Sequence, residues 1–340
     1  MRAQLQALPP AAAVKRPAKI GKREVLVAQL VRRDQDSFRG EGLQVAQINA
    51  EPKGFVLDYE ILTGSANFTF KSSVTYLILG NPIFTGTNTI EGGTVIKYTN
   101  AANLIRLTFS GNVDCKTSPY RPATFTSKDD DTVGEIISGS TGNPTNYYGQ
   151  YQIALNLSTA TFDLHDLHCR FGQTAIFVNN GTLNLSHSQI GFATNGIMVA
   201  AAAKPFTARN VLLHTLGTAF YGAGSSFTQQ CEHITMHWVG RFATGAVYRV
   251  TNSLLISVTN DVVFTGANVV TNLDDTAFFQ TVGAASHYLS VDSTSRNAGA
   301  TNINPTLLAD LKLRTTDANE LDVSRWPRLL SISSVQSPLS

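Results

Sequence analysis

Cysteine, charge and long apolar runs are all scarce in this chain of 340 residues. Its three cysteines are an odd number with no close spacing, so they form no disulfide framework or zinc-site pattern. Charged residues make up 15%, and the formal net charge of +2 is too small to indicate a nucleic-acid partner. No apolar run approaches the length of a transmembrane helix. No Walker loop, nucleophile elbow, zinc-protease motif or dinucleotide fingerprint identifies a reaction.

The positive charge that is present gathers at the start of the chain. Basic residues far outnumber acidic ones between Met1 and Gly40, in an Ala/Pro-rich stretch without a strand pattern. We expect residues 1–42 to form a basic flexible tail; a processed leader or an anchor to an acidic surface are the alternatives. No signal peptide is evident, although the abundance of Gly, Thr, Ser and Asn is typical of a secreted all-β protein. We therefore expect an extracellular or cell-surface location.

A short pattern returns every twenty or so residues between Thr161 and about Phe264, which predicts stacked structural units. Its third position holds the residue types that best tolerate a left-handed backbone without being glycine. These predicted bend residues are Asp166, His187, Asn210, His233 and Asn252. Apolar and polar residues alternate around each bend, as in strands with one face in water. The two predicted inward columns are Leu164, Leu185, Ala208, Cys231, Val250 and Cys169, Ile190, Leu213, Met236, Leu255.

The repeat, its column of bend residues and its unit length resemble the right-handed parallel β-helix of the pectate-lyase-like superfamily, of bacterial secreted or surface type. The resemblance implies an all-β, single-stranded solenoid whose parallel strands stack ~4.8 Å apart. We assign the β-helix domain to residues 43–300 and a short capping helix with a loose tail to residues 301–340. Asn304 and Pro305 predict the start of this helix, and Leu307, Leu308 and Leu311 form its apolar stripe. We expect it to plug the C-terminal end.

Two outward columns of the repeat contain candidate binding residues. Phe177, Met198 and Tyr221 form an apolar stripe on which sugar rings or another protein can pack, unless a long loop covers it. His214 and His237 share another column on adjacent coils, and Arg170 lies in that column two coils earlier. The two imidazoles can share a metal ion, bind an anionic ligand together with Arg170, or simply face solvent.

An acidic loop lies in the least regular region, between Val113 and Tyr148. Asp129, Asp130, Asp131 and Glu135 place four carboxylates within one short stretch, close enough to hold a hard cation such as Ca²⁺. The glycine and the spacing of an EF-hand loop are absent. The alternative interpretation is a solvated acidic loop without a bound ion.

These features favour a secreted or cell-surface β-helix module that is structural or binds a carbohydrate or protein partner, without catalytic power. The resemblance implies a rival: a polysaccharide lyase or glycoside hydrolase acting on an acidic polysaccharide, with its site near the acidic loop. Such enzymes need clustered or paired carboxylates, and the aligned outward columns contain no such pair. A third interpretation is an assembly subunit that stacks end to end. No cofactor is required by the leading interpretation, and Ca²⁺ is the one candidate.

Overall fold

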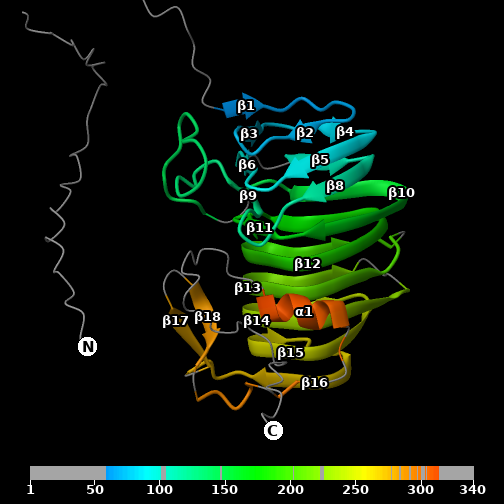
Figure 1. Cartoon of the computed structure of the whole chain (residues 1–340), viewed down its shortest axis with the longest axis vertical. Coiled ribbons are helices and arrows are strands. Elements are labelled where there is room, and N and C mark those ends of the chain that lie inside the picture. The colour runs from blue at the N-terminus through cyan, green and yellow to red at the C-terminus, as the bar shows by residue number, and fades with distance from the viewer. Residues whose placement is uncertain are drawn as a thin grey trace, which may run out of the picture. The chain divides into compact units, whose positions relative to one another are not determined.

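Parallel strands stacked in successive coils form most of the part of the chain that the structure describes (Figure 1). This structure is a computed structural model, and it describes residues 59–100, 105–145, 148–201, 203–222, 226–276, 278–282, 285–290, 292–296, 298–299, 303 and 305–313. The predicted all-β parallel solenoid is confirmed. The predicted basic tail and the loose C-terminal tail lie outside the described residues.

The strands are short in the first coils and long in the later ones. The N-terminal coils contain β1 (Tyr59–Ile61), β2 (Thr69–Phe70), β3 (Thr75–Ile78), β4 (Ile83–Phe84), β5 (Thr87–Glu91), β6 (Val95–Tyr98), β7 (Arg106–Phe109), β8 (Asn112–Lys116) and β9 (Ala123–Ser127). The later coils contain β10 (Tyr151–His165), β11 (Leu167–Arg170), β12 (Thr174–Val199), β13 (Phe206–Gly222), β14 (Thr228–Thr244), β15 (Val247–Asn260) and β16 (Thr265–Asn272). One side of the solenoid is a continuous parallel ladder in the order β1-β3-β6-β9-β11-β12-β13-β14-β15-β16.

Two columns of left-handed residues bend each later coil. The first column is the predicted one, with φ between 49° and 54° at Asp166, His187, Asn210, His233 and Asn252. A second column follows five positions later, with φ between 51° and 60° at Phe171, Phe192, Thr215, Trp238 and Ser257. Between the two bends lies a strand of four residues, and these strands, residues 167–170, 188–191, 211–214, 234–237 and 253–256, are called the short sheet below. The second column was not predicted.

The core runs along the inside of the coils as stacked columns of apolar side chains. Both predicted inward columns are buried and paired in the predicted register, for example Leu164 with Leu185 and Leu213 with Met236. The first coils are filled instead by aromatic rings, such as Phe70 and Phe84 with their centroids 5.0 Å apart. All three cysteines are free, and Cys169 and Cys231 are buried as predicted. Close packing of this kind fixes the register of the outward columns, because a slip by one residue would turn the core side chains outward.

A β-hairpin after the last coil folds back over the short sheet. It consists of β17 (Phe279–Val282) and β18 (Ala285–Leu289), which pair antiparallel. Tyr288 packs against Leu212, and Leu289 packs against Leu254 and Ile256. The hairpin therefore covers the outward face of the short sheet from β13 to β15, where it packs on Leu212, Leu254 and Ile256.

The predicted C-terminal helix is present as α1 (Pro305–Leu313). Its Asp310 carboxylate lies 3.3 Å from Nε2 of His187, a bend residue of β12. The helix therefore lies against the side of the solenoid and not across its last coil (Figure 1), so the predicted position at the C-terminal end is corrected. No helix among the described residues is both long enough and apolar enough to cross a membrane.

Candidate functional site

The predicted column of Arg170, His214 and His237 lies on the outward face of the short sheet. Arg170 pairs in register with Gly191, Gly191 pairs with His214, and His214 pairs with His237. A Cβ at Gly191 would lie 2.3 Å from Nε2 of His214. The glycine therefore gives the imidazole room to lean over the neighbouring strand. The predicted alignment of these three residues agrees with the observed register.

His237 is buried beneath the hairpin and its two nitrogens are both engaged. Nδ1 lies 3.0 Å from Nε2 of His287 on β18, and Nε2 lies 3.2 Å from Oδ2 of Asp275. The neighbouring Trp238 donates its Nε1–H to the same carboxylate oxygen at 2.6 Å. His237 thus fastens the hairpin to the solenoid. This geometry does not favour the hypothesis that His214 and His237 share one ligand or metal ion.

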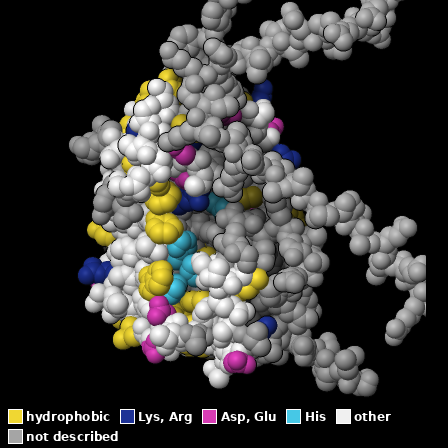
Figure 2. Space-filling view, turned by 90° about the vertical axis from the view of Figure 1, so that its left-hand side faces the viewer, with side chains coloured by type: hydrophobic (Ala, Val, Ile, Leu, Met, Phe, Trp, Pro, Cys, Tyr) yellow, Lys and Arg dark blue, Asp and Glu magenta, His cyan; other side chains and the backbone are white. Residues whose placement is uncertain are grey.

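A pocket of ≈ 160 Å³ lies where the short sheet meets the hairpin. It is called the short-sheet groove below. Its polar lining consists of His168, Arg170, Gln189, His214, Ser286 and His287. Figure 2 shows the histidines of this face in one row, with a basic side chain beside them and hydrophobic side chains along one border. Of these polar residues, only Arg170 and His214 are predicted from the repeat pattern; His168, Gln189, Ser286 and His287 are not.

One aromatic ring of the second bend column, that of Phe192, borders the groove. Phe192 lines the groove and is 40% exposed. Its ring stacks on Phe171 with a centroid distance of 5.2 Å and an interplanar angle of 23°, and it meets the edge of His214 at 5.1 Å. Large residues seldom adopt the left-handed conformation, and strained positions of this kind concentrate at functional sites. The bend at Phe192 therefore holds an aromatic face beside polar groups.

The imidazoles that line the groove are uncharged at neutral pH. Burial is the main cause that lowers the pKa of His168 to about 4, and the nearby positive charge of Arg170 lowers it further. Burial, followed by the proximity of His237, lowers the pKa of His214 to about 4. The one fixed positive charge, on Arg170, lies 2.8 Å from the Asp130 carboxylate. The groove therefore offers hydrogen-bonding groups with little net charge.

Two donors of the groove lack hydrogen-bond partners in the described part of the chain. They are the buried Nε of Arg170 and the buried Nε2 of Gln189. A buried donor without an acceptor costs about 1–3 kcal/mol, so such groups are usually explained by a water molecule or a ligand. Both donors belong to residues that line the same pocket.

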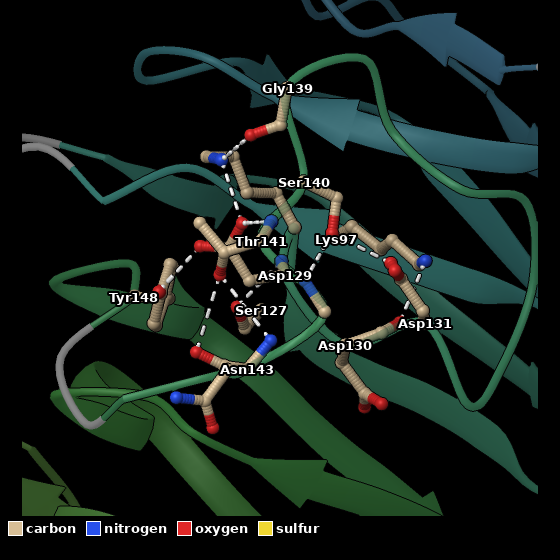
Figure 3. A network of polar contacts seen from close by, with 12 residues as sticks. Lys97, Ser127, Asp129, Asp130, Asp131, Gly139, Ser140, Thr141, Asn143 and Tyr148 are labelled. Atoms are coloured by element: carbon tan, nitrogen blue, oxygen red, sulfur yellow. Dashed lines mark hydrogen bonds and ion pairs between the residues drawn. The ribbon is translucent and has the colours of Figure 1, made fainter.

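The acidic loop is a structural network of hydrogen bonds and ion pairs. Figure 3 shows Asp129 enclosed by other residues of the network, with Tyr148 and Thr141 beside it. Asp129 accepts from Tyr148 Oη at 2.5 Å, from Lys128 Nζ at 2.8 Å and from the Thr141 amide at 2.7 Å. Burial opposes its ionisation, but the hydrogen bonds from Lys128 and Tyr148 prevail and lower its pKa to about 2. This carboxylate is satisfied by the protein itself.

The other members of the loop do not converge with Asp129 on one point. Asp131 and Glu135 are exposed, and the buried Lys97 ammonium donates to the backbone carbonyls of Asp130 and Glu135 at 2.9 and 2.6 Å. Across the described residues, no group of three or more His, Cys, Asp or Glu side chains is arranged to hold a metal ion. Calcium binding at Asp129, Asp130, Asp131 and Glu135 stays a prediction that this geometry does not favour.

The predicted stripe lies on a different strand of each coil from the groove. Met198 and Tyr221 pair in register, and Tyr221 is 39% exposed. Phe177 is only partly exposed, and its ring stacks on Tyr151 at 4.3 Å. None of the three predicted residues lines the short-sheet groove. The stripe is thus a second, separate surface.

Comparison with known proteins adds no functional evidence. No family model matches this chain, and the searches of curated proteins and of solved structures found no match.

Proposed function

We propose that this protein is a non-catalytic β-solenoid that binds a saccharide chain at the short-sheet groove. The observation that carries the proposal is the exposed ring of Phe192 beside two buried donors without partners, on Arg170 and Gln189. Saccharide sites combine an aromatic face, on which the C–H face of a sugar ring packs, with nearby groups that bind its hydroxyls. The groove has both within one pocket.

The electrostatics favour an uncharged, hydroxyl-rich ligand over an anion. A neutral imidazole has one donor and one acceptor nitrogen, and a hydroxyl likewise donates and accepts. Because the pKa values of His168 and His214 are about 4, both rings stay in that neutral form at pH 7. Asp130 also balances the Arg170 charge. At ≈ 160 Å³ the groove is smaller than the ~300 Å³ of typical ligand pockets, so it suits one sugar unit or a chain end.

The enzyme alternative lacks supporting geometry. A glycosidase needs two carboxyl groups facing one bond, and none of the groove's lining residues is acidic. Asp130, the carboxylate paired with Arg170, is 1% exposed and accepts from Thr126, Thr132 and Arg170. We therefore propose binding without turnover and without a required metal. Location outside the cell or on its surface, with a polysaccharide or surface protein as partner, belongs to the same proposal.

Substitution of Phe192 by alanine is expected to weaken saccharide binding about tenfold, or ~1.4 kcal/mol, because the stacking face is lost. Tyr221→Ala is the matched control, since Tyr221 is equally exposed at 39% but lies on the stripe. Affinity electrophoresis against neutral glucans, xylan, galactan and mannan, and against alginate and polygalacturonate, identifies the polymer. Titration calorimetry then compares the variants. Binding that survives Phe192→Ala and is lost in Tyr221→Ala would move the site to the stripe.

Incubation with the same polymers is expected to yield no new reducing ends and no ultraviolet absorbance from unsaturated products, with or without Ca²⁺. The physical reason is the absence of a free carboxylate pair in the groove. If either new reducing ends or unsaturated products appear, and Asp130→Asn abolishes them, the binding proposal is overturned and an active site lies at the acidic loop.

A further inference from the structure

The last coil of the solenoid is incomplete among the described residues. β16 is the final strand of the ladder and pairs with β15 along residues 249–256 only. β15 itself continues past its second bend to Asn260, whereas the chain beyond β16 turns away towards β17 (Figure 1). In the coil above, Val239 and Arg241 are paired by Val258 and Asn260. No described strand pairs with Val258–Asn260 in turn.

Two hollows of ≈ 480 and ≈ 430 Å³ mark this open end, and Phe264 lines both. Leu255 and Val258, which belong to the core columns, line the first hollow, and Tyr248 lines the second. Val263 is 77% exposed beside them. A free strand edge next to exposed apolar side chains is a site where a further strand can pair.

One segment of this chain is within reach of the open end. α1 ends the described part at Leu313, and its Asp310 lies beside His187 in the coil of β12. Four further strands, β13, β14, β15 and β16, separate the coil of β12 from the open end. At ~4.8 Å per strand the open end lies ~19 Å from that coil along the solenoid axis, a distance that about six extended residues can span. Residues 314–340 follow α1, whereas residues 1–58 precede β1 at the opposite end of the ladder.

The sequence of that segment contains a strand pattern. Leu330 and Ile332 alternate with Ser331 and Ser333, so an extended backbone would present two apolar side chains on one face and two hydroxyls on the other. An apolar face of this kind complements the hollows beside Val258 and Phe264. The other face carries Ser331 and Ser333 between Leu329 and Val335.

We propose that residues 326–335 of this chain supply the missing strand of the last coil and place Leu330 and Ile332 on the apolar open end. This inference rests on the open end alone and is independent of saccharide binding at the groove. Attachment through α1 keeps the segment at a high effective concentration, which favours this occupant over a separate molecule. The solenoid would then be closed by its own C-terminal segment and not by α1.

Hydrogen exchange followed by mass spectrometry tests the proposal on the full chain. The variant Leu330→Asp with Ile332→Asp places charge on the apolar face, and Ser331→Asp with Ser333→Asp adds the same charge to the other face. Amides of residues 257–264 are expected to be protected in the parent and in the serine variant. They are expected to exchange at least about tenfold faster in the leucine–isoleucine variant, while residues 182–199 stay unchanged.

Equal exchange of residues 257–264 in all three proteins would overturn the proposal. Protection that rises with protein concentration, together with a doubled mass in light scattering, would also overturn it, because a second copy would then cover the end. A second measurement does not depend on the charged variants. Val263→Cys with Ile332→Cys is expected to form an intramolecular disulfide under mild oxidation, and its failure to form would count against the proposed docking.

Discussion

Replacement of Asp130 by alanine is expected to lower the free energy of unfolding by about 3 kcal/mol, because it strands buried donors and a cation. The carboxylate is 1% exposed and accepts from Thr126 Oγ1 at 2.5 Å and Thr132 Oγ1 at 2.6 Å. Its Oδ2 also lies 2.8 Å from Nη2 of Arg170. Burial opposes ionisation of Asp130, but the hydrogen bonds from Thr126 and Thr132 and the Arg170 charge still hold its pKa below the usual value.

Asp131→Ala is the matched control for this experiment. Asp131 is the next residue of the same loop, but it is exposed and accepts a hydrogen bond from Ser140. Loss of such an exposed contact is expected to cost less than about 1 kcal/mol. Urea denaturation of both variants measures the difference. Equal losses would contradict the argument from the buried network. A Ca²⁺-dependent rise in the midpoint of the parent that Asp131→Ala removes would support the calcium site expected from sequence.

The sequence predicted the coils well because the first bend column carries a residue-type signal. Asp, Asn and His tolerate the left-handed conformation, so Asp166, Asn210 and His233 are recognisable as bends. The second column holds Phe192, Thr215 and other types that have no such preference, and here the packing of the coil imposes the conformation. The constant spacing of five residues from the first column was the only available signal.

The candidate site was predictable only as far as the repeat extends. Alternation along the short sheet placed Arg170 and His214 in one column, and the same rule places His168 and Gln189 in the other. The hairpin could not be foreseen, because its contacts join residues far apart in sequence without any repeat. The helix was found from its N-cap and leucine pattern, but an apolar stripe fits many surfaces, so its position against the side of the solenoid was not predicted.

The acidic loop shows how proximity in sequence differs from convergence in space. Four carboxylates close in sequence predicted a cation site, because proximity along the chain was taken as convergence in space. The structure instead turns Asp129 towards Tyr148 and Lys128 and turns Asp130 towards Arg170, a residue forty positions away. The sequence of the loop alone cannot predict hydrogen-bond donors that come from distant strands.

Acidification from pH 7.5 to pH 5 is expected to destabilise the fold strongly. Burial holds the folded-state pKa near 4 for His168, His214 and His233, and near 3 for His287. Their unfolded pKa is about 6.5, so the unfolded chain binds more protons as the pH falls below that value. Each group contributes stability that is complete above pH 6.5 and is lost towards pH 4, at up to about 1.4 kcal/mol per pH unit.

His233 allows this prediction to be tested at a single position. Neither of its ring nitrogens has a hydrogen-bond partner within the described residues, and the closest carboxylate oxygen, on Glu232, is 3.9 Å from Nδ1. Asn210 and Asn252 fill the same bend position in the adjacent coils, so His233→Asn keeps a residue that accepts the φ of 54°. The fall in Tm between pH 7.5 and pH 5 should be smaller in this variant than in the parent. An unchanged fall would mean that His233 binds its proton equally in both states, and the acid sensitivity would then belong to the histidines beneath and beside the hairpin.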